Sequence, residues 1–265
     1  MIDSHVHLQE YIEPKDLSLY MEELIRLEVT GLLCVSYDIE SSKKAAALSE
    51  SYEGSGLQIA VGLHPQYISS DPKEQLAELQ TILNKNKAVS AIGEIGLDYR
   101  KGMPDRELQK DFFRKQLEMS LEYGLPVSIH SVSACEDTLT ILKDHPGVKG
   151  IMHGYAYSAE AAKEFVKLGF KLGVGTTLLN PSAKKLPEVV RSIPQDYLVT
   201  ETDFPFSYKK GSPAWGGETA LECEYFTPET IKETAKLHAK MLRNLLNLLY
   251  PHSRNSHTPV HRSQH

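Results

Sequence analysis

The stretch Asp3-Ser4-His5-Val6-His7, at residues 3–7, decides how the rest of the chain is interpreted. Apolar residues around it favour extended backbone, and its polar side chains recur at every second position. Because side chains of a strand alternate between two faces, Asp3, His5 and His7 are expected on one face, with the two imidazoles roughly 7 Å apart. That spacing lets two nitrogens converge on one metal ion. An isolated pair of this kind is more often solvated surface, so the later strands must decide.

The composition is that of an ordinary globular protein. Of the 265 residues, 41% are hydrophobic and 24% are charged, which suffices for a sizeable core in one domain. The net charge of −6 and the isoelectric point near 6.0 argue against a broad phosphate-binding surface but leave room for a short contact with nucleic acid. No apolar run approaches a membrane span, and Asp3 leaves no space for a signal peptide. We therefore expect a cytoplasmic protein without membrane contact.

The three cysteines favour the same compartment. Cys34, Cys135 and Cys223 are odd in number, lie far apart and lack Cys-x-x-Cys spacing. They are expected to be reduced thiols, as in cytoplasmic proteins. Cys34 stands within an apolar run and is predicted to be a small buried side chain.

Strand-like and helix-like segments alternate along the chain as far as about residue 250. Buried strands are predicted near residues 1–7, 31–36, 57–63, 88–93, 126–129, 149–152, 171–174 and 197–200. Apolar residues at helical spacing predict helices near residues 17–28, 45–48, 72–83, 106–122, 139–142, 158–169, 186–190 and 228–248. Asp71, followed by Pro72, and Ser158 are residues that cap helices at their amino ends.

This alternation predicts the fold. Eight strands that alternate with eight helices indicate a parallel sheet closed into a single-domain (β/α)8 TIM barrel over residues 1–250. An open doubly wound sheet is the alternative, but no glycine-rich phosphate loop follows the first strand. Residues 251–265 have no periodicity and are expected to form a disordered tail.

Potential metal ligands stand where the predicted strands end. In a TIM barrel these ends meet at one mouth, which brings together side chains far apart in the sequence. Each has an ordinary structural explanation on its own, but together they predict one site. His145 and His238 lie on predicted helices and are expected to be exposed or structural. The residues at strand ends are His5 and His7, His64, Glu94, His130, His153 and Asp203.

The chain resembles the TatD family of metal-dependent hydrolases, within the amidohydrolase-like barrels. The motifs that carry the resemblance occur in the family's order: DSHVH at 3–7, VGLHP at 61–65, AIGEIGLDY at 91–99, LPVSIH at 125–130, HGY at 153–155 and ETDFP at 201–205. The resemblance implies deoxyribonuclease activity and a site for two divalent metal ions. It implies that His64 contacts substrate rather than metal, and that the metal ligands are His5, His7, Glu94, His130, His153 and Asp203.

The chemistry of these side chains agrees with such a site. The two oxygens of Glu94 can bridge two ions, one bound by His5, His7 and Asp203 and the other by His130 and His153. Mixed imidazole and carboxylate ligands suit zinc, manganese or magnesium. Water bound to such an ion becomes hydroxide near neutral pH and can attack a phosphodiester. Asp203 is expected to orient this hydroxide and accept its proton, and His64 to donate to the phosphate or the leaving oxygen.

Further side chains are expected around this centre. Asp3 and Glu201 each lie two positions from a candidate ligand on the same predicted strand face. Both are expected to accept hydrogen bonds from histidine rings and so to orient them. Tyr155, Lys209 and Lys210 are expected to contact substrate.

The chain departs from the family pattern in its predicted phosphate contacts. Relatives place an arginine and an aspartate shortly after the histidine of the fifth strand, where this chain has Ser131, Val132 and Ser133. The loss of a guanidinium would remove a bidentate phosphate partner from the mouth. The tyrosines are scattered and predict no base-stacking platform.

Three functions fit these observations. The first is a metal-dependent phosphodiesterase acting on DNA ends or single strands, because a barrel mouth admits few nucleotides. The second is hydrolysis of a small ester, lactone or amide, which would tolerate the missing arginine. The third is a metal-bound scaffold that binds a partner through residues 207–217 and catalyses little.

Overall fold

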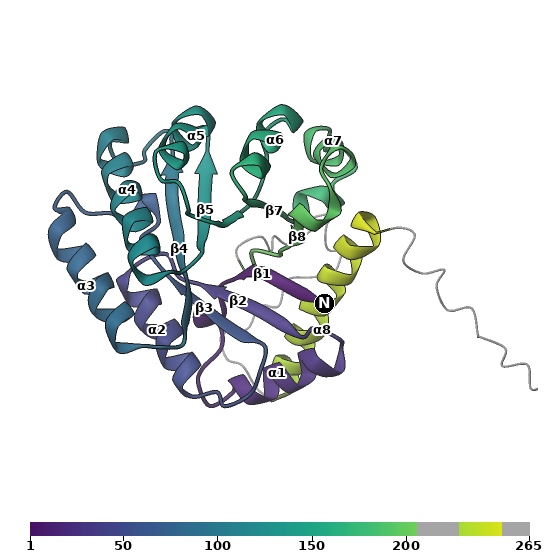
Figure 1. Ribbon diagram of the computed structural model, residues 1–265. Helices are drawn as coiled ribbons and strands as arrows, with labels where there is room; N and C mark the ends of the chain where they lie inside the picture. The colour runs from purple at the N-terminus through teal and green to yellow at the C-terminus, as the bar shows by residue number, and fades with distance from the viewer. Residues whose placement is uncertain (206–227, 251–265) are drawn as a thin grey trace, which may run out of the picture.

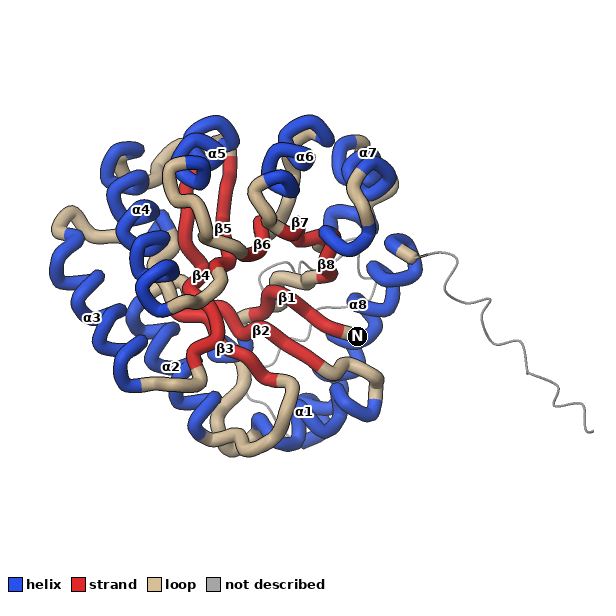
Figure 2. The backbone as a smooth tube through the Cα atoms, viewed as in Figure 1, coloured by secondary structure: helices blue, strands red, loops and turns tan. Residues whose placement is uncertain are grey.

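The computed structural model describes residues 1–205 and 228–250, and within these ranges the predicted (β/α)8 barrel is confirmed. Eight parallel strands pair in sequence order around the centre, and the α-helices lie outside them (Figures 1 and 2). The predicted tail, residues 251–265, lies outside the described residues. The strands are β1 (Ile2–Val6), β2 (Gly31–Val35), β3 (Leu57–Val61), β4 (Val89–Asp98), β5 (Val127–Val132), β6 (Gly150–Met152), β7 (Lys171–Val174) and β8 (Leu198–Thr200).

Two helices, α3 and α6, begin at the caps that the sequence indicates. The Asp71 side chain accepts a hydrogen bond from the Lys73 backbone N–H, and Ser158 Oγ accepts one from Ala161. In the described part of the chain, no helix is both long and apolar enough to cross a membrane. The helices are α1 (Leu17–Arg26), α2 (Ile39–Glu50), α3 (Pro72–Lys85), α4 (Arg106–Tyr123), α5 (Cys135–Lys143), α6 (Ala159–Lys167), α7 (Lys185–Ser192) and α8 (Pro228–Leu249).

The apolar core has separate parts on the two faces of the strands. On β3, Ile59 and Val61 belong to the main core between strands and helices, whereas Ala60 belongs to a small separate cluster. Ala60 pairs with Val35 of β2 and Ala91 of β4, which complete that cluster. Because side chains alternate along a strand, the small cluster lies inside the barrel.

The fourth and fifth strands are longer than the sequence pattern predicts. The apolar runs indicate strand ends at residues 93 and 129, but β4 continues to Asp98 and β5 to Val132. The two strands stay paired beyond Glu94, with Gly96 opposite His130. Glu94 and His130 therefore lie within paired strands, and Asp98 is carried to the end of β4.

An irregularity in β4 turns Glu94 into the barrel. The pairing of β4 with β5 shifts register between Ile92 and Ile95, and both isoleucines belong to the outer core. An extra residue between two positions reverses the face that the intervening side chains occupy. Glu94 thus lines the interior cavity, although strict alternation from Ile92 would place Gly93 there.

A similar irregularity in β1 separates Asp3 from the two histidines. The pairing of β1 with β2 shifts register between Asp3 and Val6. The Asp3 carboxylate accepts hydrogen bonds from the His5 backbone N–H and from His238 Nε2, at 3.1 and 2.7 Å. The prediction that Asp3 shares a face with His5 and His7 and orients a ring of the site is therefore wrong, because the register shift turns Asp3 toward α8.

The barrel closes where the last strand meets the first. Val6 forms an isolated parallel bridge with Phe204. The Asp203 backbone N–H donates to the His5 carbonyl at 2.9 Å, and the His7 N–H donates to the Phe204 carbonyl at 2.8 Å. These bonds join segments from the two ends of the barrel sequence.

A buried network of hydrogen bonds around Asp3 stabilises this contact between the first and last strands. Asp3 accepts two hydrogen bonds from Thr202, in addition to the bond from His238. His238 Nδ1 lies 2.7 Å from the Tyr20 hydroxyl, which lies 3.0 Å from that of Tyr11. His238 was expected to be either exposed or structural, and these contacts show that it is structural. It links α8 to β1 and α1.

We expect His238→Ala to lower the free energy of unfolding by about 3 kcal/mol, because it leaves the buried Asp3 carboxylate without its imidazole partner. Urea denaturation monitored by circular dichroism measures the effect. Lys236→Ala, at an exposed position of the same helix, is the matched control. Equal midpoints for the two variants would show that the buried network contributes nothing to closure.

Candidate metal centre

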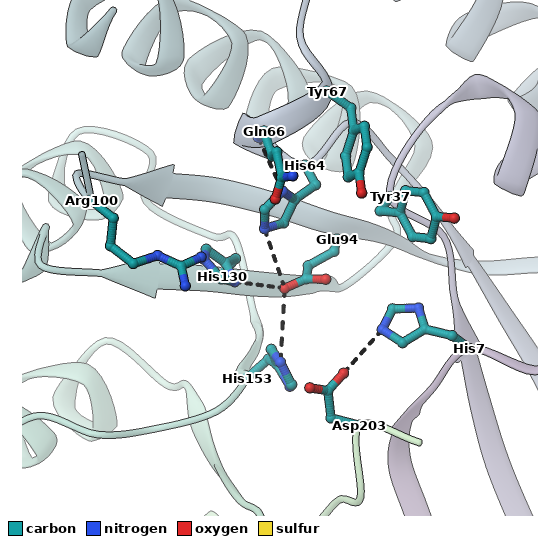
Figure 3. A pocket seen from close by; sticks show the side chains of 10 residues that line it. All are labelled: His7, Tyr37, His64, Gln66, Tyr67, Glu94, Arg100, His130, His153 and Asp203. Carbon is teal, nitrogen blue, oxygen red and sulfur yellow. Dashed lines mark hydrogen bonds and ion pairs between the residues drawn. The ribbon is translucent and has the colours of Figure 1, made fainter. Parts of the chain in front are cut away.

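A cavity of about 270 Å³ opens at the carboxyl end of the barrel strands. Figure 3 shows Glu94 at its centre, with imidazoles above, below and beside it. His5 is fully buried and is not part of the cavity lining. The side chains that line the cavity are His7, Tyr37, His64, Gln66, Tyr67, Glu94, Arg100, His130, His153 and Asp203.

Three candidate ligands meet at the seam between β1 and β8. His7 Nε2 lies 3.1 Å from Asp203 Oδ1 and 3.2 Å from His5 Nε2. Asp203 has a φ of 55°, in the left-handed region that aspartate tolerates, and its carboxylate turns toward His7 (Figure 3). Barrel closure thus brings together side chains that are 196 residues apart in the chain.

The buried carboxylate of Glu94 faces four imidazoles. Its Oε1 lies 2.8 Å from His130 Nδ1, 3.8 Å from His153 Nε2 and 4.0 Å from His64 Nε2. Its Oε2 lies 3.5 Å from His5 Nε2. Burial alone would raise the pKa of this carboxyl, but the surrounding imidazoles hold its pKa well below the usual range. Glu94 is therefore ionised, and its two oxygens face different histidines.

The spacing and chemistry of these atoms fit divalent metal ions. Ligand atoms bound to a tetrahedral ion at 2.0–2.1 Å lie roughly 3.4 Å from one another. Imidazole nitrogens and carboxylate oxygens are donors that zinc and manganese accept. In the described ranges, three groups have potential ligand atoms within 4.8 Å of one another: His5, Glu94 and His153; His5, His7 and Asp203; and His64, Glu94 and His130.

This grouping differs from the expected pair of ion sites. The ring of His153 stacks on that of His5, with centroids 3.5 Å apart, and His153 groups with His5 and Glu94. His130 groups with Glu94 and His64, and its ring centroid is 6.5 Å from that of His153. Each of His130 and His153 thus groups with Glu94, but within residues 1–205 and 228–250 no group of three contains both histidines.

Contacts behind the rings set their orientation. His7 Nδ1 donates to the Val35 carbonyl at 2.7 Å, which leaves Nε2 facing the site. His5 Nδ1 lies 3.3 Å from Ser128 Oγ. Outer contacts of this kind fix both the ring position and the tautomer of histidines in metal sites.

Glu201 lies against a histidine ring of the site, as we expected, and the ring is that of His153. Its Oε1 is 3.1 Å from His153 Nδ1 and accepts a hydrogen bond from the Gly154 N–H at 2.6 Å. Burial alone would lower the pKa of His153, but Glu201 raises it to about 10. Gly173 makes room for this carboxylate, because a Cβ at Gly173 would lie 2.0 Å from Glu201 Oε2.

His64 presents an N–H group to the cavity. Its Nδ1 accepts a hydrogen bond from the Gln66 backbone N–H at 3.1 Å. Burial lowers the pKa of His64 to about 4, so the ring is neutral at neutral pH. A neutral imidazole whose Nδ1 is an acceptor carries its proton on Nε2, the nitrogen that faces Glu94.

Tyr155, which was expected to contact substrate, does not line the cavity. Tyr155 is 3% exposed, packs in the main core and donates its hydroxyl to the Ser158 carbonyl, so this expectation is wrong. Gly154, with a φ of 56°, turns the chain so that the ring enters the core. Lys209 and Lys210 lie outside the described residues.

Asp98 and Arg100 belong to the site, although the sequence pattern did not lead us to expect them there. Arg100 lines the cavity, so the expectation of a mouth without a guanidinium is wrong. The buried Asp98 carboxylate lies 3.1 Å from His130 Nε2 and accepts hydrogen bonds from the Arg100 backbone N–H and Nε. Both residues follow Glu94 at even spacing, and this was the signal that could have placed them on one strand face.

Two tyrosines also line the cavity, which their scattered positions in the sequence did not lead us to expect. Tyr37 and Tyr67 come from different loops, and their ring centroids lie 4.8 Å apart. Their separation of 30 positions in the chain left no sequence pattern from which to predict the contact.

The chain is similar to proteins of one family. It matches the family model described as TatD related DNase over residues 2–251. It is 32% identical to the metal-dependent hydrolase YabD of Bacillus subtilis over 256 residues, which cover 94% of this chain and 99% of that protein. The deoxyribonuclease Tat-D of Schizosaccharomyces pombe is 29% identical over 222 residues, or 79% of this chain and 70% of that protein. The crystal structure of the TatD homologue YjjV of Escherichia coli aligns with a TM-score of 0.72 at 28% identity, covering 94% and 97% of the two chains.

We expect Gly173→Ala to weaken metal binding by roughly ten- to hundredfold, because the new methyl group displaces Glu201 from His153. Gly175→Ala is the matched control, since its Cβ would meet Glu201 Oε1 at an ordinary 3.5 Å. Metal titration by calorimetry, with thermal unfolding to verify the fold, measures the difference. Equal affinities for both variants would contradict a role of Glu201 in orienting His153.

Proposed function

The chain belongs to the TatD-related DNase family of metal-dependent hydrolases, and from this premise we propose that it hydrolyses phosphodiester bonds of DNA at ends or single strands. The observation that carries the proposal is the convergence of imidazoles and carboxylates around Glu94, beside an open cavity. The relative named deoxyribonuclease Tat-D supports the choice of substrate.

Two divalent ions, whether zinc, manganese or magnesium, are the proposed cofactors. The residues that would hold them are His5, His7, Glu94, His130, His153 and Asp203. When bound, such ions acidify coordinated water and stabilise negative charge on phosphate oxygens.

Asp203 is the proposed general base. Its side chain is 36% exposed and faces the cavity, while its Oδ1 contacts His7. Burial alone would raise its pKa, but the hydrogen bond with His7 and the charges of nearby imidazoles lower it, so the carboxylate is ionised. It accepts a proton from the attacking water as the water oxygen bonds to phosphorus. The ester P–O bond breaks, and the leaving oxygen takes a proton from solvent.

His64 is the proposed hydrogen-bond donor to the phosphate. Its Nε2–H points into the cavity, and Nδ1 is occupied by the Gln66 N–H. A neutral imidazole is too weak an acid to give up this proton readily, so it stabilises charge through a hydrogen bond, as neutral histidines do in other enzymes. This role separates His64 from the metal-holding histidines, although its Nε2 lies near Glu94.

The shape and charge of the protein favour unpaired DNA over duplex DNA. The cavity of about 270 Å³ lies below the usual range for ligand pockets and admits only a short piece of chain. The net charge of −6 argues against binding of a long double helix through its phosphates. A strand end or an unpaired segment can enter such a cavity.

We expect the metal-loaded protein to degrade a labelled single-stranded oligonucleotide faster than the same sequence in a duplex. Chelation should abolish cleavage, and added zinc, manganese or magnesium should restore it. Asp203→Asn should lower kcat by at least about 100-fold. Equal cleavage by this variant would indicate a contaminating nuclease. Turnover of a lactone in a parallel panel, without oligonucleotide cleavage, would favour the alternative of a small-ester hydrolase.

We expect His64→Ala to lower kcat by about 100-fold while the metal content stays that of the unaltered protein, because the lost group contacts substrate. His64→Gln, which keeps an N–H donor, should recover part of the loss. His145→Ala, outside the cavity lining, serves as the control. Metal content from elemental analysis decides the role, and loss of an ion from His64→Ala would make His64 a ligand instead.

A further inference from the structure

Tyr37 and Tyr67 form an aromatic wall on one side of the cavity. Tyr37 follows β2, and Tyr67 ends the short 3-10 turn Pro65–Tyr67 after β3. Their rings are tilted by 32° with centroids 4.8 Å apart. The Tyr37 ring also lies 5.9 Å from that of His7, and the Tyr67 ring lies 6.0 Å from that of His64. The two tyrosines thus lie next to His7, a candidate metal ligand, and next to His64, the proposed hydrogen-bond donor to the phosphate.

Tyr67 remains partly exposed beside this polar centre. The residue is 42% exposed although its ring packs against Tyr37. An aromatic face held in place by a second ring is a platform on which a nucleobase can stack. Stacking on such platforms tolerates every base, because each base has a π-face.

Arg100 lies on the other side of Glu94 from the two tyrosines (Figure 3). Its backbone N–H and its Nε donate to the Asp98 carboxylate at 3.0 and 2.9 Å, and Nη2 contacts the same carboxylate. Asp98 is fully buried, so it anchors the guanidinium, whereas the Arg100 side chain is 53% exposed. Within the described residues, Nη1 of Arg100 makes no hydrogen bond, which leaves it available to a ligand.

We infer that the cavity binds one unpaired nucleotide, with the base stacked on Tyr67 and a phosphate oxygen bound by Arg100. The inference rests on the proposed function and adds the residues that select the substrate. The anchored guanidinium supplies a fixed positive charge at a cavity in a chain of net charge −6. The ring pair supplies affinity for a base without reading its identity.

This arrangement selects against bases within a duplex. A base inside a double helix is stacked on both faces and paired at its edge, so it can reach Tyr67 only after it is unstacked. A terminal or single-stranded nucleotide already exposes a face. Tyr67 therefore gives a physical reason for a preference for unpaired DNA.

The first arm of the test removes either the Tyr67 ring or the terminal bases of the oligonucleotide. Tyr67→Ala should raise KM for a single-stranded oligonucleotide by roughly 5- to 150-fold, and Tyr67→Phe should restore it, because stacking needs the ring and not the hydroxyl. An oligonucleotide whose two terminal nucleotides lack a base should show a similar rise with the unaltered protein. Tyr67→Ala should no longer distinguish the two substrates. Tyr123→Ala, which lies outside the cavity lining, is the matched control.

The second arm measures the phosphate contact by binding. In an Asp203→Asn background that does not cleave, fluorescence anisotropy gives the salt dependence of affinity for the labelled oligonucleotide. Arg100→Gln should reduce the slope of log affinity against log salt by about 0.7, the value for one phosphate contact on a single strand. Lys101→Gln makes the same charge change at the next residue, outside the cavity lining, and should leave the slope unchanged. Elemental analysis of each variant verifies that its metal content equals that of the unaltered protein, since Asp98 contacts both Arg100 and His130.

The results separate this inference from the proposed function. If the unaltered protein cleaves DNA but Tyr67→Ala and Arg100→Gln match their controls, the inference is overturned and the nuclease assignment stands. If the unaltered protein hydrolyses no oligonucleotide with any added ion, but Arg100→Gln still lowers the salt slope of binding relative to Lys101→Gln, the phosphate contact stands and the nuclease assignment fails. If Arg100→Gln and Lys101→Gln lower the salt slope equally, the specific Arg100 contact is overturned, and the effect reflects the overall charge of the protein.

Discussion

The burial of one carboxylate, Glu94, constrains the rest of the site. A buried charge is costly unless opposite charges or hydrogen-bond donors surround it. Glu94 faces imidazoles from four places along the chain: β1, the loop after β3, β5 and the segment after β6. A centre of this kind is stable only with positive charge nearby, whether protons on imidazoles or divalent ions. The cluster of Val35, Ala60 and Ala91 forms a separate apolar part of the barrel interior.

Much of this arrangement could be predicted because it repeats a simple rule. Parallel strands end at one rim, so His130, His153 and Asp203 could be assigned to the same mouth from their positions after apolar runs. The alternation of strands and helices likewise predicted the barrel. Glu201 was placed correctly because it lies two residues from Asp203, with Gly173 opposite to admit it.

The errors arise where pairing departs from regular alternation. The register shift in β1 sends Asp3 toward α8, and the shift in β4 sends Glu94 inward. Neither shift has a local signature in the sequence, because a bulge is a property of two strands together. Arg100 was missed because β4 was predicted to end before it, and the contact between Tyr37 and Tyr67 depends on two loop conformations.

The contact between the first and last strands of the barrel determines when the metal centre can assemble during folding. His5 and His7 come from the first strand, and Asp203 follows the last, so their meeting requires that both termini of the ring be present. A nascent or truncated polypeptide that lacks β8 has no partner for the first strand and cannot assemble this half of the centre. The centre can therefore assemble only after the barrel is complete. An incomplete chain does not acquire the hydrolytic centre of the full-length protein.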